Sequence, residues 1–198
     1  HAPLALRSDY EKQLRRCHDE LGFRHVRFHS ILSDQMGTMI INENHPLYSF
    51  LNTDRIMDVL IEIGMKPLVE LSFMPHALAS GNQTVFHYQA NVTAPRDYQQ
   101  WETLIDKLVR HWIDRYGLDE VRSWPMEVWN EPNMPSFWPG GQKEYFKLYR
   151  HTVTAVKNVD AALTVGGPVT ARCEWIEPFL DFADAENLLD YIDDLGVS

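Results

Sequence analysis

The sequence predicts an α/β fold of parallel strands, of the (β/α)8 or TIM-barrel type, and three observations lead to this prediction. Helical and extended segments alternate along the 198 residues, as they do in βαβ units. Several of the expected strands carry charged side chains on one face and apolar side chains on the other. The hydrophobic content of 44% is enough to bury a sizeable core in one or two domains.

The expected elements are helix 8–21, strand 25–29, helix 54–63, strand 66–73, helix 96–116, strand 124–130, helix 142–158, strand 163–167, helix 174–188 and a weaker strand at 190–197. The first helix has apolar positions at helical spacing and ends before Gly22, because glycine adopts the left-handed C-cap conformation without strain. Gly64 and Gly117 end the next two helices in the same way. Asn52 or Thr53 is the expected N-cap of the second helix.

The first expected strand separates two kinds of side chain, since successive residues of a strand point to opposite faces. Val26 and Phe28 share a face suited to packing under helices, whereas His25, Arg27 and His29 share the other face. Both faces of an ordinary parallel sheet are apolar. The charged face therefore indicates a polar interior.

The next two strands repeat this separation. The set expected to face the helices consists of Val69, Leu71, Phe73, Met126 and Val128. The set expected to face the interior consists of Glu70, Ser72, Glu127 and Trp129. Charged groups from several strands must pair in order to be buried together. A barrel suits this pattern better than a doubly wound sheet, and its active site lies at the C-terminal ends of the strands.

Charge and composition exclude several classes of partner. The formal net charge of -10 argues against a nucleic-acid groove or an anionic membrane surface, both of which select for clustered Lys and Arg. No apolar run approaches the roughly 20 residues of a membrane span, and residues 1–10 lack the regions of a signal peptide. Two distant cysteines, Cys17 and Cys173, favour a reducing, cytoplasmic setting over secretion.

Two further patterns carry weaker signals. The sequons that begin at Asn82 and Asn91 suit a secreted glycoprotein, but such triplets often arise by chance. His25 and His29 lie close in sequence, yet no third metal ligand has recognisable spacing. The sequence therefore predicts neither a metal site nor a cofactor.

The stretch SWPMEVWNEPNMPSFW at 123–138 places Glu131 where a strand of β-branched and aromatic residues stops. A carboxyl group at the C-terminal end of a barrel strand lies in the active-site region, and His29 ends the first expected strand in the same way. The alternative is a surface glutamate that caps the turn before Pro132. These residues alone leave both interpretations open.

An ordered set of motifs carries a wider resemblance. It consists of FRHVRFH, GMKPLVELSFMP, ASGNQTVFHYQANVTAP, RYGLDEVRSWPMEVWNEPN, FWPGGQKEYFKLYRHTVTAVK and LTVGGP, and it extends over residues 4–192. On these motifs the chain resembles glycoside hydrolase family 39, with the closest similarity to its bacterial β-xylosidases. The α-L-iduronidases form a related branch.

The resemblance implies a retaining mechanism on two carboxylates about 5 to 5.5 Å apart, through a covalent glycosyl-enzyme. Glu131 matches the family's acid/base, and Asn130 matches the side chain that hydrogen-bonds the sugar 2-hydroxyl. Arg27 and His29 resemble the family's Arg-x-His. By this analogy His29 touches a sugar hydroxyl, and Arg27 holds the nucleophile ionised.

A purely structural role stays open for two of these side chains. Arg27 and His29 also suit interior ion pairs with Glu70 and Glu127, and Glu127 is expected to support the site in this way. For Arg27 both roles are compatible.

Residues after the strands are likewise open to two interpretations. Asp34 and Phe73 are expected to shape the sugar pocket, although loop polarity and barrel packing account for them equally well. Phe137 and Trp138 have the shape to stack on pyranose faces, whereas packing is the preferred role for Trp129.

The chain departs from the family pattern in its extent. The family's nucleophile is a Glu near the end of the seventh strand, whereas the last expected strand here corresponds to the sixth, and the first strand is cut. We therefore expect residues 1–198 to form part of a catalytic barrel domain, roughly from the end of strand 1 to about strand 6. The other strands and any β-sandwich accessory domain are expected outside this chain, and the expected protein partner is a second copy or a second segment that completes the barrel.

The function implied by the resemblance is a retaining exo-glycosidase, a β-xylosidase that releases xylose from xylo-oligosaccharides. An α-L-iduronidase type of exo-glycosidase and a non-catalytic carbohydrate-binding fragment without a nucleophile are the alternatives. The acidic balance and the match at residues 74–95 favour xylose, because an iduronate carboxylate would call for cationic groups near the sugar.

Overall fold

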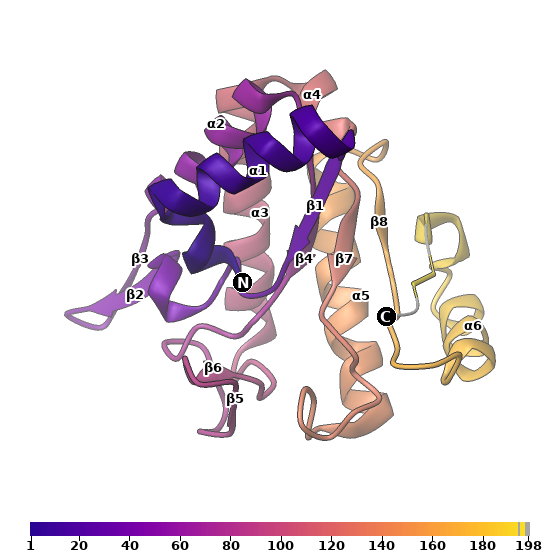
Figure 1. Cartoon of the computed structure of the whole chain (residues 1–198). Coiled ribbons are helices and arrows are strands. Elements are labelled where there is room, and N and C mark those ends of the chain that lie inside the picture. The colour runs from indigo at the N-terminus through magenta and orange to yellow at the C-terminus, as the bar shows by residue number, and fades with distance from the viewer. Residues whose placement is uncertain (194, 197–198) are drawn as a thin grey trace.

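The computed structural model describes residues 1–193 and 195–196, which form an α/β fold around a parallel sheet (Figure 1). The sheet consists, in spatial order, of β1 (His25–Phe28), β4 (Lys66–Leu71), β7 (Met126–Val128) and β8 (Val165–Gly166). The α-helices are α1 (Ser8–Leu21), α2 (Leu51–Ile63), α3 (Tyr98–Tyr116), α4 (Leu118–Arg122), α5 (Gly141–Val159) and α6 (Ile176–Ala185). At least one helix separates each sheet strand from the next, as the alternating pattern predicts.

Short elements decorate the loops. Two antiparallel hairpins pair β2 (Met39–Asn42) with β3 (His45–Tyr48) and β5 (Thr84–Val85) with β6 (Ala90–Asn91). The 3-10 helices are η1 (Ala2–Leu6), η2 (Asp34–Met36) and η3 (Leu189–Tyr191). Both hairpins extend from the C-terminal side of the sheet strands that precede them, β1 and β4.

The strand register brings two glutamates side by side. Glu70 of β4 lies opposite Glu127 of β7, and Arg27 of β1 lies opposite Leu68 of β4. Because the strands are parallel, their C-terminal ends meet at one edge of the sheet, where ligands bind in open α/β sheets. The segments that follow β1, β4 and β7 converge at this edge.

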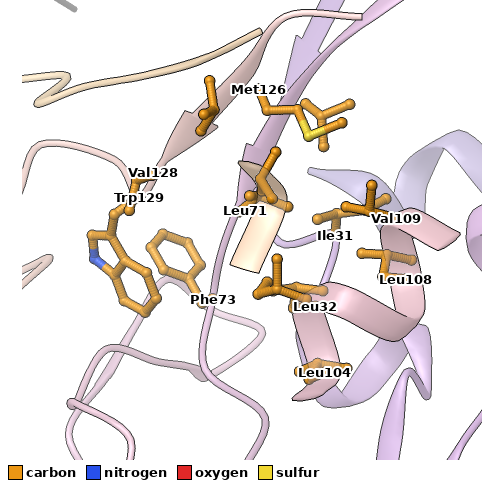
Figure 2. Packing of buried hydrophobic residues seen from close by; sticks show 14 of the residues in the cluster. Ile31, Leu32, Leu71, Phe73, Leu104, Leu108, Val109, Met126, Val128 and Trp129 are labelled. Atoms are coloured by element: carbon orange, nitrogen blue, oxygen red, sulfur yellow. The ribbon is translucent and has the colours of Figure 1, made fainter. Parts of the chain in front are cut away.

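Apolar side chains from the helices and the sheet form one buried cluster. The members labelled in Figure 2 come from α3, from the loop after β1, and from β4 and β7 with the residues just beyond them: Leu104, Leu108, Val109, Ile31, Leu32, Leu71, Phe73, Met126, Val128 and Trp129. Burial of one such side chain stabilises a fold by about 1.5–3 kcal/mol. This packing holds the strand ends in place beneath the loops.

The helix ends confirm the glycine predictions, with Gly117 as the C-cap of α3, and correct the cap prediction. Gly22 and Gly64 adopt the left-handed conformation after α1 and α2. The N-cap of α2 is Phe50, because the helix begins earlier than the polar residues suggest. Asn52 donates its amide hydrogen bond to the carbonyl of Met36, and Thr53 donates its hydroxyl to the carbonyl of Phe50. Both side chains therefore connect α2 to other residues without capping it.

Several elements differ from the predicted series. Helix α4 begins directly after Gly117, so this glycine bends the chain between two helices. The two hairpins are missing from the prediction because their strands are only two to four residues long and lack a clear period of two. The weak strand expected at 190–197 is wrong for residues 190–191, which lie in η3, and residues 194, 197 and 198 lie outside the described residues.

Within the described ranges, no helix combines the length and the apolar character that crossing a membrane requires.

Candidate active site

Arg27 of β1 lies between two carboxylates from neighbouring strands. Its Nε donates to Oε2 of Glu127 at 2.6 Å, and its Nη2 lies 2.9 Å from Oε2 of Glu70. The Glu70 side chain is 0% exposed and the Glu127 side chain 10% exposed. Buried carboxylates require such partners, because an unpaired charge is costly to desolvate. These contacts confirm the interior ion pairs that the strand faces predict.

His29 follows β1 and contacts the same buried carboxylate. Its Nδ1 lies 2.6 Å from Oε2 of Glu70, and the Ser72 hydroxyl donates to the other oxygen of Glu70. The sequence predicts the same interior face for His25. His25 is exposed at the first residue of β1, at the opposite end of the strand from His29, so it lies away from this cluster.

Asn130 and Glu131 lie directly after β7. Asn130 is 3% exposed, and its Oδ1 accepts a hydrogen bond from Nη2 of Arg27 at 3.1 Å. Glu131 is partly exposed, and its backbone N–H donates to the carbonyl of Val169 at 2.8 Å. Its carbonyl accepts from the backbone N–H of Met134 at 2.9 Å. The strand end therefore brings Asn130 and Glu131 to the edge occupied by Arg27.

The backbone after β7 is bent in an unusual way. Trp129 has a φ of 71° and Glu131 a φ of 42°, both in the left-handed region. Residues with side chains adopt this region at a cost, and such positions are frequent at functional sites. The bend interrupts the extended path, so the alternation of faces ends at Val128.

The points at which β4 and β7 end correct two face assignments. Trp129 is expected in the polar interior and Phe73 under the helices, but the two rings contact each other in a T-shaped arrangement, 5.3 Å between centroids (Figure 2). Both side chains are fully buried. Because β4 ends at Leu71 and β7 at Val128, the period of two no longer applies to these positions. The packing role preferred for Trp129 is confirmed.

An aromatic group surrounds His29. The Phe73 ring lies 6.0 Å from the His29 ring, and Phe137 stacks on Phe73 at 6.1 Å. Phe86 of the loop between β5 and β6 stacks on His29 at 5.7 Å and is 42% exposed. Phe86 is absent from the predicted site. The aromatic run VFHY at 85–88 is the only sequence signal for it, and the hairpin that brings it to His29 is too short to predict.

Trp138 is also part of this packing. It is 1% exposed, and its ring lies 5.2 Å from that of Trp129. Trp138 therefore packs against the end of β7 in the interior. Of the two roles considered from the sequence, the structure supports packing for Trp138 and not stacking on a sugar.

Asp34 lies at the first residue of η2 and contacts the loop after β4. Its carboxylate accepts from the backbone N–H of His76 at 3.1 Å and lies 2.8 Å from Nδ1 of the same residue. Both side chains are about half exposed. Asp34 thus joins two of the loops at the strand ends, and the structure gives it a role in loop positioning.

Two tyrosines near the strand ends have raised pKa values. Burial raises the pKa of the Tyr88 phenol, whose oxygen accepts from the Ser30 hydroxyl at 3.0 Å. Burial also raises the pKa of Tyr145, which donates its hydroxyl to the carbonyl of Val128 at 2.9 Å. Both phenols remain neutral hydrogen-bonding groups at ordinary pH.

Together these residues form a compact polar site with an aromatic rim. One guanidinium faces two carboxylates, and an amide and a third carboxyl group, Glu131, follow on the same edge. Across the described residues there is no cluster of three or more His, Cys, Asp or Glu side chains that would hold a metal ion. The arrangement suits proton transfer by a carboxyl group and hydrogen bonding to a polar ligand such as a sugar.

Comparisons with known proteins identify relatives over most of the chain. Residues 1–195 match the family model of the glycosyl hydrolases family 39. A β-xylosidase of Caldicellulosiruptor saccharolyticus is 53% identical over 195 residues, which cover 97% of this chain and 40% of that protein. The α-L-iduronidase of Homo sapiens is 30% identical over 149 residues, 74% of this chain and 21% of that protein.

A solved structure agrees with these relatives. The crystal structure of a monomeric β-xylosidase from Caulobacter crescentus CB15 has a TM-score of 0.94 and 39% identity, over 98% of this chain and 39% of that chain. The present chain thus spans about two fifths of the length of both β-xylosidases. On the match over residues 1–195 and the shared fold, the chain belongs to glycosyl hydrolases family 39.

Proposed function

We propose that this chain carries the acid/base part of the active site of a retaining exo-glycosidase, a β-xylosidase that releases xylose from xylo-oligosaccharides. The observation that carries the proposal is the pair Asn130 and Glu131 at the end of β7, with the Asn130 carbonyl held by Arg27. The relatives named β-xylosidase support the choice of sugar. The four parallel strands are proposed to form part of a (β/α)8 barrel, in keeping with the share of those relatives that the chain spans.

The proposed reaction uses Glu131 twice. Glu131 donates a proton to the glycosidic oxygen as the bond between that oxygen and C1 breaks, while a second carboxylate forms a bond to C1. Glu131 then accepts a proton from the water that attacks C1, and the bond to the second carboxylate breaks to release xylose. The second carboxylate is not assigned to any residue of this chain.

Asn130 and Arg27 are proposed to prepare the sugar for this reaction. Since the Asn130 carbonyl accepts from Arg27, its amide N–H groups are available as donors to the sugar 2-hydroxyl. Hydrogen bonds to this hydroxyl strengthen in the oxocarbenium-like transition state. Arg27 is proposed to hold the nucleophile ionised as well, because its guanidinium remains charged at all relevant pH values.

The charge of the site favours a neutral sugar over an iduronate. Glu70 and Glu127 outnumber Arg27 in the interior, and Glu131 adds a further carboxyl group. An anionic substrate would meet repulsion from these groups. The iduronidase type of activity is therefore the less favoured alternative, and a non-catalytic carbohydrate-binding role is the outcome to expect if no hydrolysis is found.

The test is a comparison of Glu131→Gln with the wild-type protein on two xylosides. Xylobiose has a poor leaving group that needs protonation, whereas a dinitrophenyl xyloside does not. We expect a loss of about 10²- to 10⁴-fold in kcat/KM on xylobiose and a much smaller loss on the aryl xyloside.

The matched control is Glu174→Gln, because Glu174 lies nearby, accepts from Asn133 at 2.8 Å and is exposed. This variant should retain wild-type rates on both substrates. Equal losses on both substrates in Glu131→Gln would refute the acid/base assignment. Binding of xylobiose without hydrolysis by the wild-type protein would favour the non-catalytic role.

A further inference from the structure

Glu70 is a fully buried carboxylate that receives three polar partners. His29 contacts Oε2 through Nδ1 at 2.6 Å, and Arg27 contacts the same oxygen through Nη2 at 2.9 Å. Ser72 donates its hydroxyl to Oε1. With its side chain 0% exposed, Glu70 has no surface with which to touch a substrate. Glu70 therefore affects the binding of a ligand only indirectly, through the side chains that it positions.

The contact with Glu70 decides which nitrogen of His29 carries the proton. A carboxylate is an acceptor only, so the Nδ1 at 2.6 Å from Oε2 must be a donor. In the neutral imidazole the other nitrogen, Nε2, is then an acceptor. The ring cannot turn freely, because it stacks on Phe86 at 5.7 Å and lies 6.0 Å from Phe73.

His29 is still accessible to a ligand in this arrangement. Its side chain is 29% exposed although Nδ1 is occupied. A sugar hydroxyl is a donor as well as an acceptor, so it is able to donate to an unprotonated Nε2. If Nε2 carried the proton, it would be a donor, and the sugar hydroxyl would have to accept a hydrogen bond from it through an oxygen lone pair.

We propose that Glu70 is a positioning residue which fixes His29 in the tautomer protonated at Nδ1, so that Nε2 accepts a hydrogen bond from a substrate hydroxyl. The part of this proposal that concerns the substrate rests on the proposed function. Glu70 also helps to position Asn130, because Arg27 contacts both Glu70 and Asn130. Removal of Glu70 should therefore change the recognition of the sugar without removing a residue that touches it.

The direct test is the tautomer of His29 in the wild-type protein, measured by two-bond nitrogen–proton correlation NMR with ¹⁵N-labelled histidine. The His29→Gln variant assigns the signals. We expect His29 to be protonated at Nδ1 and unprotonated at Nε2 above the pH at which the imidazole loses its charge. A wild-type His29 protonated at Nε2 would overturn the proposal, with no variant of Glu70 needed.

Two variants test the cause. Glu70→Leu removes both acceptor oxygens, and we expect His29 to change to the tautomer protonated at Nε2. Glu70→Gln keeps one acceptor oxygen in a side chain of the same shape, and we expect it to retain the wild-type tautomer. His76, whose Nδ1 lies 2.8 Å from Asp34, should be unchanged in both variants.

The control for the loss of an ion pair elsewhere on β4 is Glu120→Leu, whose pair with Lys66 is partly exposed. Glu120 contacts Lys66, at the start of the same strand β4, and Trp124. This variant should destabilise the fold but leave the His29 signals in place. A Glu70→Leu protein that folds and keeps the wild-type His29 tautomer would overturn the proposal. If Glu70→Leu does not fold, the wild-type tautomer and Glu70→Gln still decide the outcome.

Kinetics separate this inference from the proposed function. In Glu70→Leu we expect KM for the aryl xyloside to rise about tenfold, the value of one hydrogen bond, with partial recovery in Glu70→Gln. A wild-type protein that has the expected tautomer but neither binds nor hydrolyses xylosides would refute the proposed function while supporting the link between Glu70 and His29. An unchanged KM in a Glu70→Leu variant with an altered tautomer would refute the role of Nε2 in substrate binding.

Discussion

Arg27 orients the side chain of Asn130 by its carbonyl end, with 3.1 Å between Nη2 of Arg27 and Oδ1 of Asn130. The guanidinium cannot accept a hydrogen bond, so this contact distinguishes the two ends of the amide. An amide held in this way turns its oxygen toward Arg27 and leaves its N–H groups for other acceptors.

This orientation predicts the effect of Asn130→Asp. Aspartate retains an acceptor for Arg27 but has no N–H donor for the sugar, and it adds a negative charge. We expect kcat/KM on aryl xylosides to fall by at least about tenfold, the value of one lost hydrogen bond, while the folded protein keeps its thermal stability within a few degrees. Steady-state kinetics and thermal unfolding measure the two effects, and an Asn130→Asp enzyme with wild-type kcat/KM would contradict the proposed donor role.

Arg27→Lys should lower both activity and stability. Arg27 makes its contacts to Glu127, Glu70 and Asn130 through two different nitrogens, and a lysine ammonium cannot reproduce this geometry. We expect a loss of about 1–3 kcal/mol in the free energy of unfolding, measured with urea, and a fall in kcat.

Arg122→Lys is the control for that change, because Arg122 also contacts a carboxylate, Asp160, through two nitrogens but lies away from the strand ends. It should leave kcat unaltered. Wild-type kcat in Arg27→Lys would reduce Arg27 to a structural ion pair.

Gly167→Ala should destabilise the fold beside the site. A Cβ at Gly167 would lie 2.9 Å from the Tyr145 hydroxyl and 3.3 Å from the Tyr149 ring, and the φ of +143° disfavours a side chain. We expect a loss of about 1–3 kcal/mol, measured by chemical unfolding. Gly117→Ala is the matched control, since Gly117 has a φ of +87° but nothing within 4 Å. If both variants lose the same stability, the predicted clash with Tyr145 is absent.

The pair of Asp58 and Arg115 predicts part of the stability in acid. Hydrogen bonds from Arg115 lower the pKa of Asp58 below its usual 3.8. A lowered folded pKa means that the stabilisation is present above about pH 3.8 and is lost as the pH falls through the folded value. Asp58→Asn should therefore be less stable than wild type at pH 6, by less than about 1 kcal/mol for a partly exposed pair, and the difference should shrink as the pH falls through the folded pKa of Asp58.

Urea unfolding across this pH range measures that difference. Asp114→Asn, an exposed aspartate on α3, serves as the comparison and should show a smaller effect at pH 6. A difference for Asp58→Asn that stays constant from pH 6 to pH 2 would rule out the contribution of its ionised form.

The sequence predicts the architecture well because the relevant signals are local. Helices of ten or more residues have several turns of periodic apolar positions, and glycines such as Gly22 and Gly64 end them where the backbone must turn left-handed. The pairing of Arg27 with Glu70 and Glu127 is predictable for a related reason, since alternate strand residues share a face and buried charges need partners.

The geometry of the site beyond the strands is not predictable in this way. Phe73 and Trp129 do not follow the predicted alternation, because β4 ends two residues before Phe73 and β7 ends one residue before Trp129. The left-handed φ of Trp129 is not predictable from the sequence, since no glycine occupies that position. Phe86 reaches His29 through a hairpin with two-residue strands, whose position depends on tertiary contacts. The assignments of Glu131 and Asn130 to catalysis depend on the family motif, because the residues alone leave a turn-capping role open.

The T-shaped contact between Trp129 and Trp138 also has an optical consequence. Two indoles with centroids 5.2 Å apart and planes inclined by 76° couple their electronic transitions, and a coupled pair of this kind gives a signed doublet in circular dichroism. Trp129 lies two positions before Glu131, so a ligand that displaces this strand end alters the doublet. A second pair, Trp112 with Trp124, is 5.8 Å apart between α3 and the segment before β7 and adds a constant contribution to the same spectral region, so the ligand-induced change is read from a difference spectrum. The protein therefore contains its own spectroscopic probe of the residues that flank the candidate acid, one that needs neither a dye nor a turnover assay.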